Sequence, residues 1–381
     1  MSQLETAAPT STAPGGTAPA GTAPAGVAPA GTAPGISPRA SQTAHRYDTA
    51  DLESHRRELT GYCYRMLGSG FEADDAVQDT MVRAWRSLDR FDGRSSLRTW
   101  LYRIATNVCL DQLNGRARRA RPMDLGPASS ADTPVGPLIT DNLWVQPVHD
   151  RAVLSESADP AEVAATRESI RLAFVSALQL LPPRQRAVLI LREVLRWQAG
   201  EVAELLGTSV ASVNSALQRA RATIDSHAHE ERPTEAMSPE QQILLDRYVE
   251  AFQRYDMKAL TSLLHADAVQ TMPPYELWLS GRDHILEFWQ GQGHGCRGSL
   301  LLPTTANGLP AFGQYRPSGT PGRYEPWALQ LLTIAGGQIV EFSFFLNAAE
   351  LFPSFGLPLD PNLRAAASVP MSSSGPDGQP S

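Results

Sequence analysis

The chain has 381 residues, 42% of them hydrophobic and 19% charged, with a formal net charge of −7, which suits two or three domains with buried cores. No run of about 18 apolar residues predicts a membrane span, and the N-terminus lacks the basic and apolar segments of a signal peptide. Cys63, Cys109 and Cys296 lie far apart without metal-ligand spacing, so we expect no metal and a reducing, cytoplasmic location.

The negative net charge argues against a nucleic-acid binder, but the charges are unevenly distributed. Residues 55–122 carry 13 arginines against 8 acidic residues, and residues 184–224 carry 6 against 3. Residues 122–165 carry 1 arginine against 7 acidic residues, and residues 238–381 carry 8 basic against 13 acidic ones. Because phosphate contact is local, two basic islands remain compatible with nucleic-acid binding.

Both ends of the chain are predicted to be disordered tails. Residues 1–47 are mostly Ala, Pro, Gly and Thr, with a five-residue repeat of the type GTAPA from residue 16 to residue 35. Such a segment cannot bury enough apolar surface to offset its chain entropy. The last residues, 359–381, are expected to be disordered in the same way.

Residues 48–115 predict an all-α domain of three helices. Apolar residues at three- and four-residue spacing mark helices over about Leu59–Met66, Ala73–Leu88 and Leu97–Cys109. The first of them ends near Gly68.

Three single positions of this domain have an expected structural role. Ser95 is the expected N-cap of the third helix. Trp85 and Trp100 fall in the apolar stripes and are expected in the core.

Residues 116–165 contain many Pro, Ser, Asp and Gly, which predicts a loose linker, although its Trp144–Pro147 stretch could dock on a domain.

Residues 166–228 predict a second all-α domain. Its expected helices lie around 170–181, 183–194, 197–206 and 209–224. Gly207 between the last two indicates a helix-turn-helix. The inward face of the last helix is expected to carry Val210, Val213, Leu217 and Ala220.

Residues 238–358 predict an α+β domain. Helices around 239–255 and 259–264 precede alternating, aromatic-rich segments. Two of these, 324–334 and 338–346, form a β-hairpin around a Gly-Gly turn.

The two helical regions carry sequence blocks that together indicate a function. They are Asp74–Trp85, Arg90–Asn107, Leu180–Leu189 and Glu201–Gly207. In this order, the chain resembles the σ2 and σ4 domains of extracytoplasmic-function (group IV) RNA polymerase sigma factors, over roughly 55–115 and 166–226. The resemblance implies a protein that binds core RNA polymerase at the β′ clamp and β flap, recognises the −10 promoter element through σ2 and the −35 element through σ4, and starts transcription.

The resemblance also implies roles for particular residues of σ2. The face of the second predicted helix that is turned away from the core is expected to dock on the β′ clamp helices; it carries Asp75, Gln78, Asp79 and Arg83. The alternative is an acidic helix N-terminus that the helix dipole favours and that only faces solvent.

Promoter opening requires unstacked bases to be held, which calls for polar groups and for Arg on the backbone. The residues implied for the −10 element are Arg94, Ser95, Ser96, Arg98, Arg103 and Asn107. A basic cluster beyond them is either a phosphate contact or a disordered basic tail; it consists of Arg116, Arg118, Arg119 and Arg121.

The outward face of the helix-turn-helix is implied to recognise the −35 element, because the N-terminal part of a recognition helix reaches base edges. That face carries Ser209, Ser212, Asn214, Ser215, Gln218, Arg219 and Arg221. The chain departs from the family pattern at Asn214 and Ala216, where Lys or Arg is usual, so we expect fewer phosphate contacts there.

The C-terminal region resembles the SnoaL-like branch of the nuclear-transport-factor-two-like cone fold. The likeness lies in Ala266–Pro274 and Trp278–Arg282. Six aromatic residues either line a pocket of that cone or fill an ordinary core: Trp278, Phe288, Trp289, Trp327, Phe342 and Phe344. His265 and Asp267 are the nearest acid/base candidates, but they are expected exposed near a helix end, so we expect neither catalysis nor a cofactor.

In sigma factors with such a fused domain, the resemblance implies that the domain modulates polymerase binding in cis. We hypothesise that the apolar stretch Leu351–Pro358 docks on σ2 or on the linker, and a small-molecule ligand for the domain stays open. A ligand-sensing helix-turn-helix regulator is the alternative function, but it leaves residues 55–115 without a purpose. A SnoaL-type enzyme with a DNA-binding appendage would need an acid/base pair, which we do not find.

Overall fold

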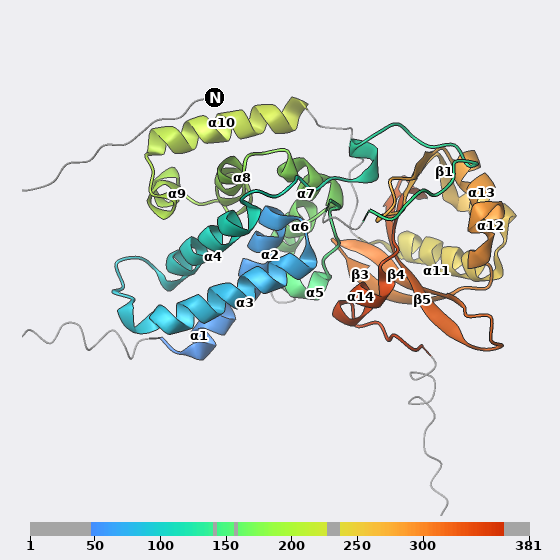
Figure 1. Ribbon diagram of the computed structural model, residues 1–381, viewed down its shortest axis with the longest axis horizontal. Helices are drawn as coiled ribbons and strands as arrows, with labels where there is room; N and C mark the ends of the chain where they lie inside the picture. The colour runs from blue at the N-terminus through green and yellow to red at the C-terminus, as the bar shows by residue number, and fades with distance from the viewer. Residues whose placement is uncertain (1–46, 140–142, 156–158, 227–236, 362–381) are drawn as a thin grey trace, which may run out of the picture.

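The computed structural model describes residues 47–139, 143–155, 159–226 and 237–361. The two predicted tails therefore lie almost wholly outside the described residues. Figure 1 shows a helical part and an α+β domain side by side. Across the described ranges, no helix is both long and apolar enough to cross a bilayer.

The first helical domain contains the three predicted helices and a short one before them. The helices are α1 (Thr49–Ser54), α2 (Arg56–Leu67), α3 (Gly70–Ser87) and α4 (Leu97–Leu113), with a 3-10 turn at Leu88–Arg90. Their apolar stripes meet in a core that includes the fully buried Leu59, Tyr62 and Leu101. The predicted N-cap of α4 is wrong by one residue: the Ser96 side chain accepts the Thr99 N–H at 3.0 Å, because helical dihedrals begin only at Leu97.

The segment between the two helical domains is not the loose linker that its composition predicts. It forms a 3-10 turn at Pro122–Asp124 and the short α5 (Asp150–Val153). Its backbone bonds to the C-terminal domain, since the Ser129 N–H donates to the Trp278 carbonyl at 2.8 Å. Trp144 is only 5% exposed, so the predicted docking of the Trp144–Pro147 stretch is confirmed at this residue. Polar, Pro-rich composition did not reveal these long-range contacts.

The second helical domain contains the predicted helix-turn-helix. Its helices are α6 (Pro160–Ser169), α7 (Leu172–Gln179), α8 (Pro183–Leu189), which continues into a π-helical turn at Ile190–Val194, α9 (Ala199–Leu206) and α10 (Val210–Ser226). Gly207 adopts the left-handed conformation, with φ 61°, that ends α9. Val213, Leu217 and Ala220 are buried as expected, but Val210 is 46% exposed, because it lies at the first turn of α10, beyond the reach of α8 and α9.

The C-terminal domain is an α+β cone built on a six-stranded sheet of order β2-β1-β6-β5-β4-β3. Only the β1–β6 pair is parallel among these strands. The elements are α11 (Pro239–Arg254), α12 (Met257–Leu263), β1 (Leu264–Thr271), β2 (Trp278–Ser280), α13 (Arg282–Gln290), a 3-10 turn (Gln292–Cys296), β3 (Leu300–Ala306), β4 (Leu309–Pro317), β5 (Tyr324–Ala335), β6 (Gln338–Phe345) and α14 (Ala348–Ser354). The fold class and the β5–β6 hairpin predicted from the sequence are confirmed.

Alternation along the strands gives this sheet two apolar faces. One face is covered by α11, α12 and α13, and there the rings of Tyr248 and Trp289 lie 5.7 and 5.5 Å from that of Phe342. Of the six aromatic residues considered from the sequence, four fill this core, whereas Trp278 and Trp327 are half-exposed at its edge. The interior of the cone is therefore packed with side chains.

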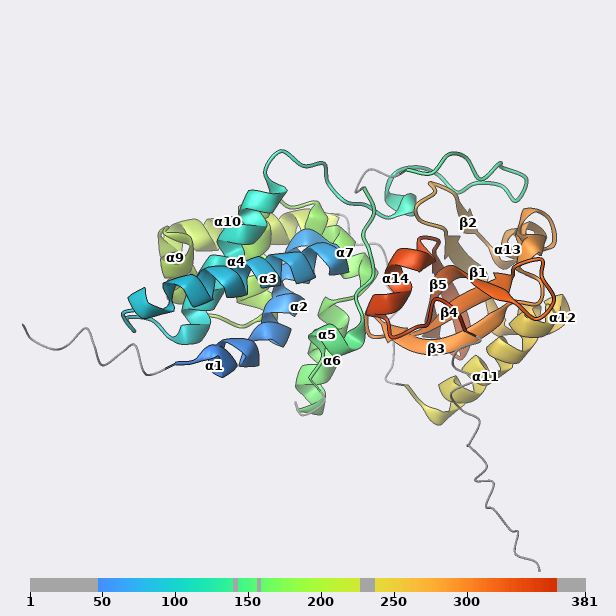
Figure 2. The same ribbon diagram turned by 60° about the horizontal axis from the view of Figure 1, so that its bottom comes forward.

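The other face of the sheet is covered by α14, as Figure 2 shows. Leu351, Phe352, Phe355 and Leu357 are all nearly fully buried there. The hypothesised docking on σ2 or the linker is thus replaced mainly by packing on the domain's own sheet. A contact with the linker remains, since the Phe355 ring lies 5.5 Å from the His149 ring.

The two acid/base candidates lie in the first half of strand β1, directly after α12 ends at Leu263, so their expected place near a helix end is confirmed. His265 Nδ1 accepts the backbone N–H of Asp267 at 3.1 Å, and the Asp267 side chain is 80% exposed. The pair faces solvent on the outside of the domain.

Candidate nucleic-acid interface

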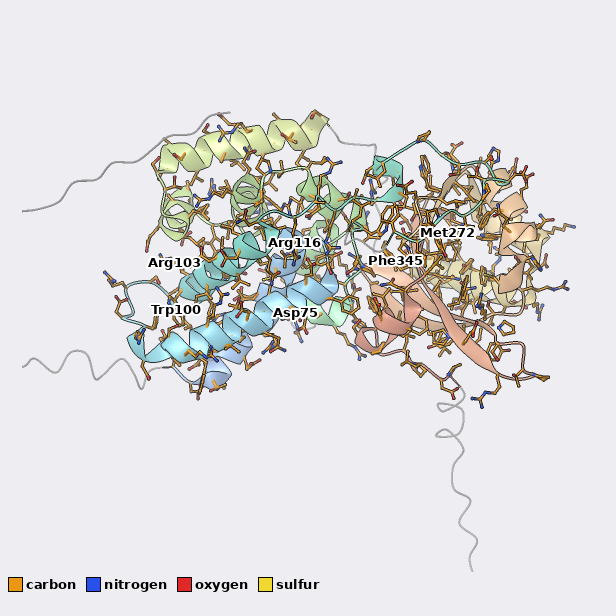
Figure 3. All side chains as sticks on the ribbon, in the orientation of Figure 1. Asp75, Trp100, Arg103, Arg116, Met272 and Phe345 are labelled. Atoms are coloured by element: carbon orange, nitrogen blue, oxygen red, sulfur yellow. The ribbon has the colours of Figure 1, made fainter. Side chains whose placement is uncertain are left out.

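Helix α3 leaves a polar face open to solvent. Ser69 caps the helix by accepting the Glu72 N–H at 3.3 Å, and the opposite stripe is buried against α2 and α4. Asp75 and Gln78 are exposed, as predicted, and Figure 3 shows Asp75 on the outer side of α3.

Two other predicted members of this face are joined to each other. Arg83 forms an ion pair with Asp79 at 2.7 Å, one helical turn apart, and a second, longer one with Asp111 at 3.8 Å. Asp79 is half-buried as a result, whereas Arg83 is exposed.

The expectation that Trp85 is a core residue is wrong, because Trp85 is 64% exposed. It lies at the edge of the apolar stripe, and none of the helices in the described ranges buries that edge. Val82, 43% exposed, lies beside it. With Asp75 and Gln78 these residues form one face at three- and four-residue spacing, which we call the α3 stripe. A helical-wheel plot of the sequence places these residues on one face, but it does not show that this face is exposed to solvent.

The loop before α4 is open, and its candidate residues can be reached. The Arg94 side chain is 89% exposed and forms an ion pair with Asp92 at 2.5 Å. Ser95 is half-buried and Ser96 is exposed, with its hydroxyl group used as the α4 cap. Phe91 and Trp100 close the base of this loop, with ring centroids 5.0 Å apart, so Trp100 lies at the border of the core.

The candidate arginines of α4 itself are engaged by other parts of the helical region. Arg98 bonds to Glu58 at 2.7 Å, and its guanidinium lies 5.4 Å from the ring of Trp197, at the start of the second domain's helix-turn-helix. Arg103 donates to Glu204 of α9 at 3.4 Å. Figure 3 shows Arg103 on the side of α4 that faces α9. Asn107 is exposed, whereas the side chains of Arg98 and Arg103 are 41% and 39% exposed and are partly covered by these contacts.

The basic cluster at 116–121 is neither a free phosphate contact nor a disordered tail. Arg119 is 5% exposed and bonds to Glu72 at 2.8 Å and to the Trp144 carbonyl at 2.7 Å. Arg116 shares the same Glu72 carboxylate at 2.7 Å. Arg116 and Arg118 are both exposed, whereas Arg121 is half-buried. Two of these arginines therefore bind a structural carboxylate.

The outward face of α10 is exposed along its length, as its sequence pattern predicts. All seven candidate residues of this face are exposed: Ser209, Ser212, Asn214, Ser215, Gln218, Arg219 and Arg221. Ser209 caps the helix through the Ser212 N–H at 3.2 Å. Arg219 bonds to the Ser215 hydroxyl and Arg221 to Glu193, both at 2.6 Å. The side chains at the N-terminal end of α10 are thus displayed on an ordered turn.

The two helical domains pack together through buried polar bonds. Arg65 of α2 donates to the Ser169 hydroxyl at 2.6 Å. Arg186 of α8 donates to the Met66 carbonyl and to the Gln179 side chain. Burial lowers the pKa of both arginines to about 10, so both stay charged at neutral pH. Buried hydrogen bonds of this kind hold a specific arrangement, and water can replace them when the domains part.

Three family models match the chain. They are Sigma-70 region 2 over residues 52–119, Sigma-70, region 4 over residues 171–224, and SnoaL-like domain over residues 245–342. The first two cover the helical domains described above, and the third covers the α+β cone.

Relatives extend this likeness over most of the chain. The ECF RNA polymerase sigma factor SigG of Mycobacterium tuberculosis is 45% identical over 316 residues, which are 81% of this chain and 84% of SigG. SigW of Bacillus subtilis is 28% identical over 170 residues, 45% of this chain and 82% of SigW. The crystal structure of the M. tuberculosis extracytoplasmic function sigma factor SigJ has the same fold, with a TM-score of 0.52 at 22% identity, covering 82% of this chain and 100% of that one.

Proposed function

The chain belongs to the extracytoplasmic-function RNA polymerase sigma factors, which direct transcription initiation, and from this premise we propose roles for particular residues of its helical domains. The first helical domain is σ2 and the second is σ4. The alternative, a ligand-sensing helix-turn-helix regulator, is not favoured. Such a regulator would have no role for residues 55–115, whereas Sigma-70 region 2 matches residues 52–119.

We propose that the α3 stripe, together with Asp79 and Arg83, docks on the β′ clamp of the core polymerase. Interface hot spots are typically large aromatic side chains within a polar rim. Trp85 supplies such a group, and Asp75 and Gln78 supply the rim. The exposure of the Trp85 ring in the free protein supports this role, since burial of the ring against a partner would contribute favourable free energy to binding.

We propose that the loop Asp92–Ser96 and α4 hold the −10 element, and that the open face of α10 reads the −35 element. Arg94 and Asn107 are exposed, whereas Arg98 and Arg103 are partly covered, and they lose their contacts with Trp197 and Glu204 once the second domain leaves α4. On α10, Asn214 and Gln218 are suited to adenine edges and Arg219 and Arg221 to phosphates.

Transcription from purified components tests these roles. Core polymerase and the full-length chain would transcribe genomic DNA fragments, and sequencing of RNA 5′ ends would map the start sites. We expect new start sites that share two elements, and we expect Arg94→Ala to reduce them on the order of tenfold, as loss of one charged contact costs. Arg90→Ala, an exposed arginine outside the proposed site, is the control and should leave them unchanged.

We propose that the C-terminal domain regulates σ2 and σ4 in cis in the cytoplasm and does not catalyse a reaction. Its sheet edge and α14 contact the linker, and its β3–β4 turn contacts both helical domains. A groove of about 950 Å³ between α6, α11 and β3–β4 is the place where a ligand could reach this junction. Transcription by a chain ending at residue 235, compared with the full-length chain, measures the domain's net effect.

A further inference from the structure

The turn between β3 and β4 is the part of the C-terminal domain that enters the helical region most deeply. It consists of Asn307 and Gly308, both in the left-handed conformation with φ 55° and 74°. An Asn-Gly pair is the preferred sequence for such a two-residue hairpin turn. Asn307 is nonetheless completely buried. Hairpin tips are usually solvated, so this burial requires a specific set of partners.

Asn307 uses every hydrogen-bonding group of its side chain on a different part of the chain. Its Nδ2 donates to the Tyr64 hydroxyl in σ2 and to the Ile170 carbonyl at the start of σ4, both at 2.6 Å. Its Oδ1 accepts the Val148 N–H of the linker at 3.0 Å, and its own N–H donates back to the Val148 carbonyl at 3.0 Å. One amide thus joins σ2, the linker and σ4.

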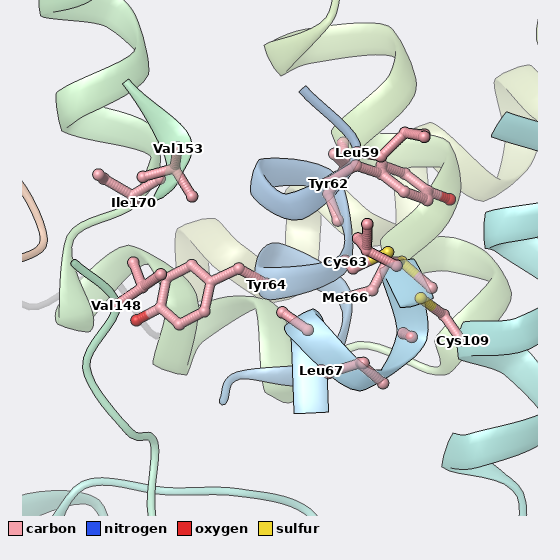
Figure 4. Packing of buried hydrophobic residues seen from close by; sticks show 14 of the residues in the cluster. Leu59, Tyr62, Cys63, Tyr64, Met66, Leu67, Cys109, Val148, Val153 and Ile170 are labelled. Atoms are coloured by element: carbon pink, nitrogen blue, oxygen red, sulfur yellow. The ribbon is translucent and has the colours of Figure 1, made fainter. Parts of the chain in front are cut away.

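The surroundings of this turn strengthen the connection. Figure 4 shows the Tyr64 ring reaching out from α2 toward Val148 and Ile170. The Tyr64 hydroxyl donates onward to the Gln146 carbonyl at 2.9 Å. The Gly308 N–H donates to Asp150 at 2.8 Å, and a Cβ at Gly308 would lie 3.0 Å from that of Arg167, so the turn fits closely.

This arrangement keeps σ2 and σ4 too close for promoter recognition. α9 lies between α4 and α10 and contacts both. Packed helices are about 8–10 Å apart, so α4 and α10 are at most about 20 Å apart. Elements centred near −10 and −35 lie about 25 base pairs apart, or about 85 Å at 3.4 Å per base pair. The domains must therefore part before both elements can be bound.

We infer that Asn307 is the latch that holds σ2 against σ4 and so keeps the promoter-binding face of α4 partly covered until the domains part. Moving σ2 away from σ4 must break its bond to Tyr64 or its bond to Ile170. Because one side chain makes both bonds, the C-terminal domain opposes opening through a single buried residue. This inference rests on the proposed function for its consequence, but the latch itself is a property of the free protein.

Asn307→Ala tests the latch in the full-length chain. Run-off transcription with core polymerase should rise on the order of tenfold, since losing buried hydrogen bonds shifts the equilibrium toward the open arrangement. Amide hydrogen exchange at Val148, whose N–H is protected by Asn307, should speed up by a similar factor. Tyr64→Phe, which removes the σ2 partner of Asn307 together with its bond to the Gln146 carbonyl but leaves the bond to Ile170, should act in the same direction more weakly and serves as the readout if Asn307→Ala does not fold.

Asn347→Ala is the matched control, because the Asn347 side chain bonds to Glu350 within its own helix. It should change neither exchange at Val148 nor transcription. Unchanged exchange in both latch variants would overturn the inference, and so would faster exchange with unchanged or reduced transcription. Absence of transcripts from every chain, the wild type included, would instead count against the proposed function, while exchange would still test the latch.

Discussion

At the scale of single residues, the α3 stripe shows how an important position escapes a periodicity argument. Trp85 is spaced correctly for the core, yet it lies at the edge of the stripe, where the described part of the chain leaves it 64% exposed. Leaving an indole in water forgoes about 1.5–3 kcal/mol of burial free energy. A binding partner that covers the ring recovers that energy, which is why the exposed ring supports docking at this face.

Trp85→Ala should weaken core polymerase binding roughly 30-fold, which corresponds to about 2 kcal/mol and is typical of an aromatic hot spot. Titration of labelled chain with core polymerase measures the affinity. Ile243→Ala, which truncates a side chain that is 59% exposed on α11, should leave the affinity unchanged. Equal affinities for the wild type and Trp85→Ala would remove Trp85 from the proposed interface.

At the scale of secondary-structure elements, α14 changes the interpretation of the C-terminal apolar stretch. The apolar residues Leu351, Phe352 and Phe355 suggest a docking segment in the sequence, but in the fold they pack on the domain's own sheet. Phe352 is completely buried, with its ring 5.0 Å from that of Tyr315 on β4. The helix therefore closes the face of the sheet that α11–α13 do not cover.

Phe352→Ala should lower the free energy of unfolding by about 3–5 kcal/mol, as truncation of a buried aromatic ring does. Thermal unfolding followed by circular dichroism measures the loss. Leu359→Ala, at a position 51% exposed, is the control and should change stability by less than about 0.5 kcal/mol. A melting curve of Phe352→Ala that coincides with the wild type would mean that α14 is not part of the folded domain.

At the scale of the whole molecule, the junction between the linker and the C-terminal domain contains a half-buried histidine, His149, whose pKa is shifted by its surroundings. Burial, together with the nearby Arg151, lowers the pKa of His149 below its ordinary value of 6.5. Its Nδ1 accepts the Arg151 N–H at 2.9 Å, so the neutral ring is the bonded form. Burial also raises the pKa of the neighbouring Asp150 above its ordinary value.

Acidification should therefore loosen this junction. A histidine with a depressed pKa in the folded state contributes stability that is full above pH 6.5 and is lost as the pH falls through the folded-state value. Unfolding by urea at pH 7.5, 6.5 and 5.5 should show a decline that His149→Gln reduces. His294→Gln, at an exposed histidine, should keep the wild-type decline; if His149→Gln keeps it too, His149 does not cause it.

Much of the fold and part of the site follow from local pattern in the sequence. Apolar periodicity predicts the helices of σ2 and σ4, and alternation around a Gly-Gly turn predicts the β5–β6 hairpin. The open face of α10 is also predictable, because three of the four expected inward residues are buried and the polar ones are exposed. These features depend on neighbours a few residues away, and the sequence displays such neighbours directly.

Only the tertiary structure decides which side chains meet across the chain. In the folded chain, Arg119 pairs with Glu72, and the Arg98 guanidinium lies near the Trp197 ring. Trp85 stays exposed, and Asn307 bonds to Tyr64, 243 positions away. No local periodicity encodes such contacts, because they depend on how separately formed elements pack. The sequence by itself therefore determined the fold classes and the family. Packing decided which of the proposed functional side chains are exposed and which are bonded to other elements.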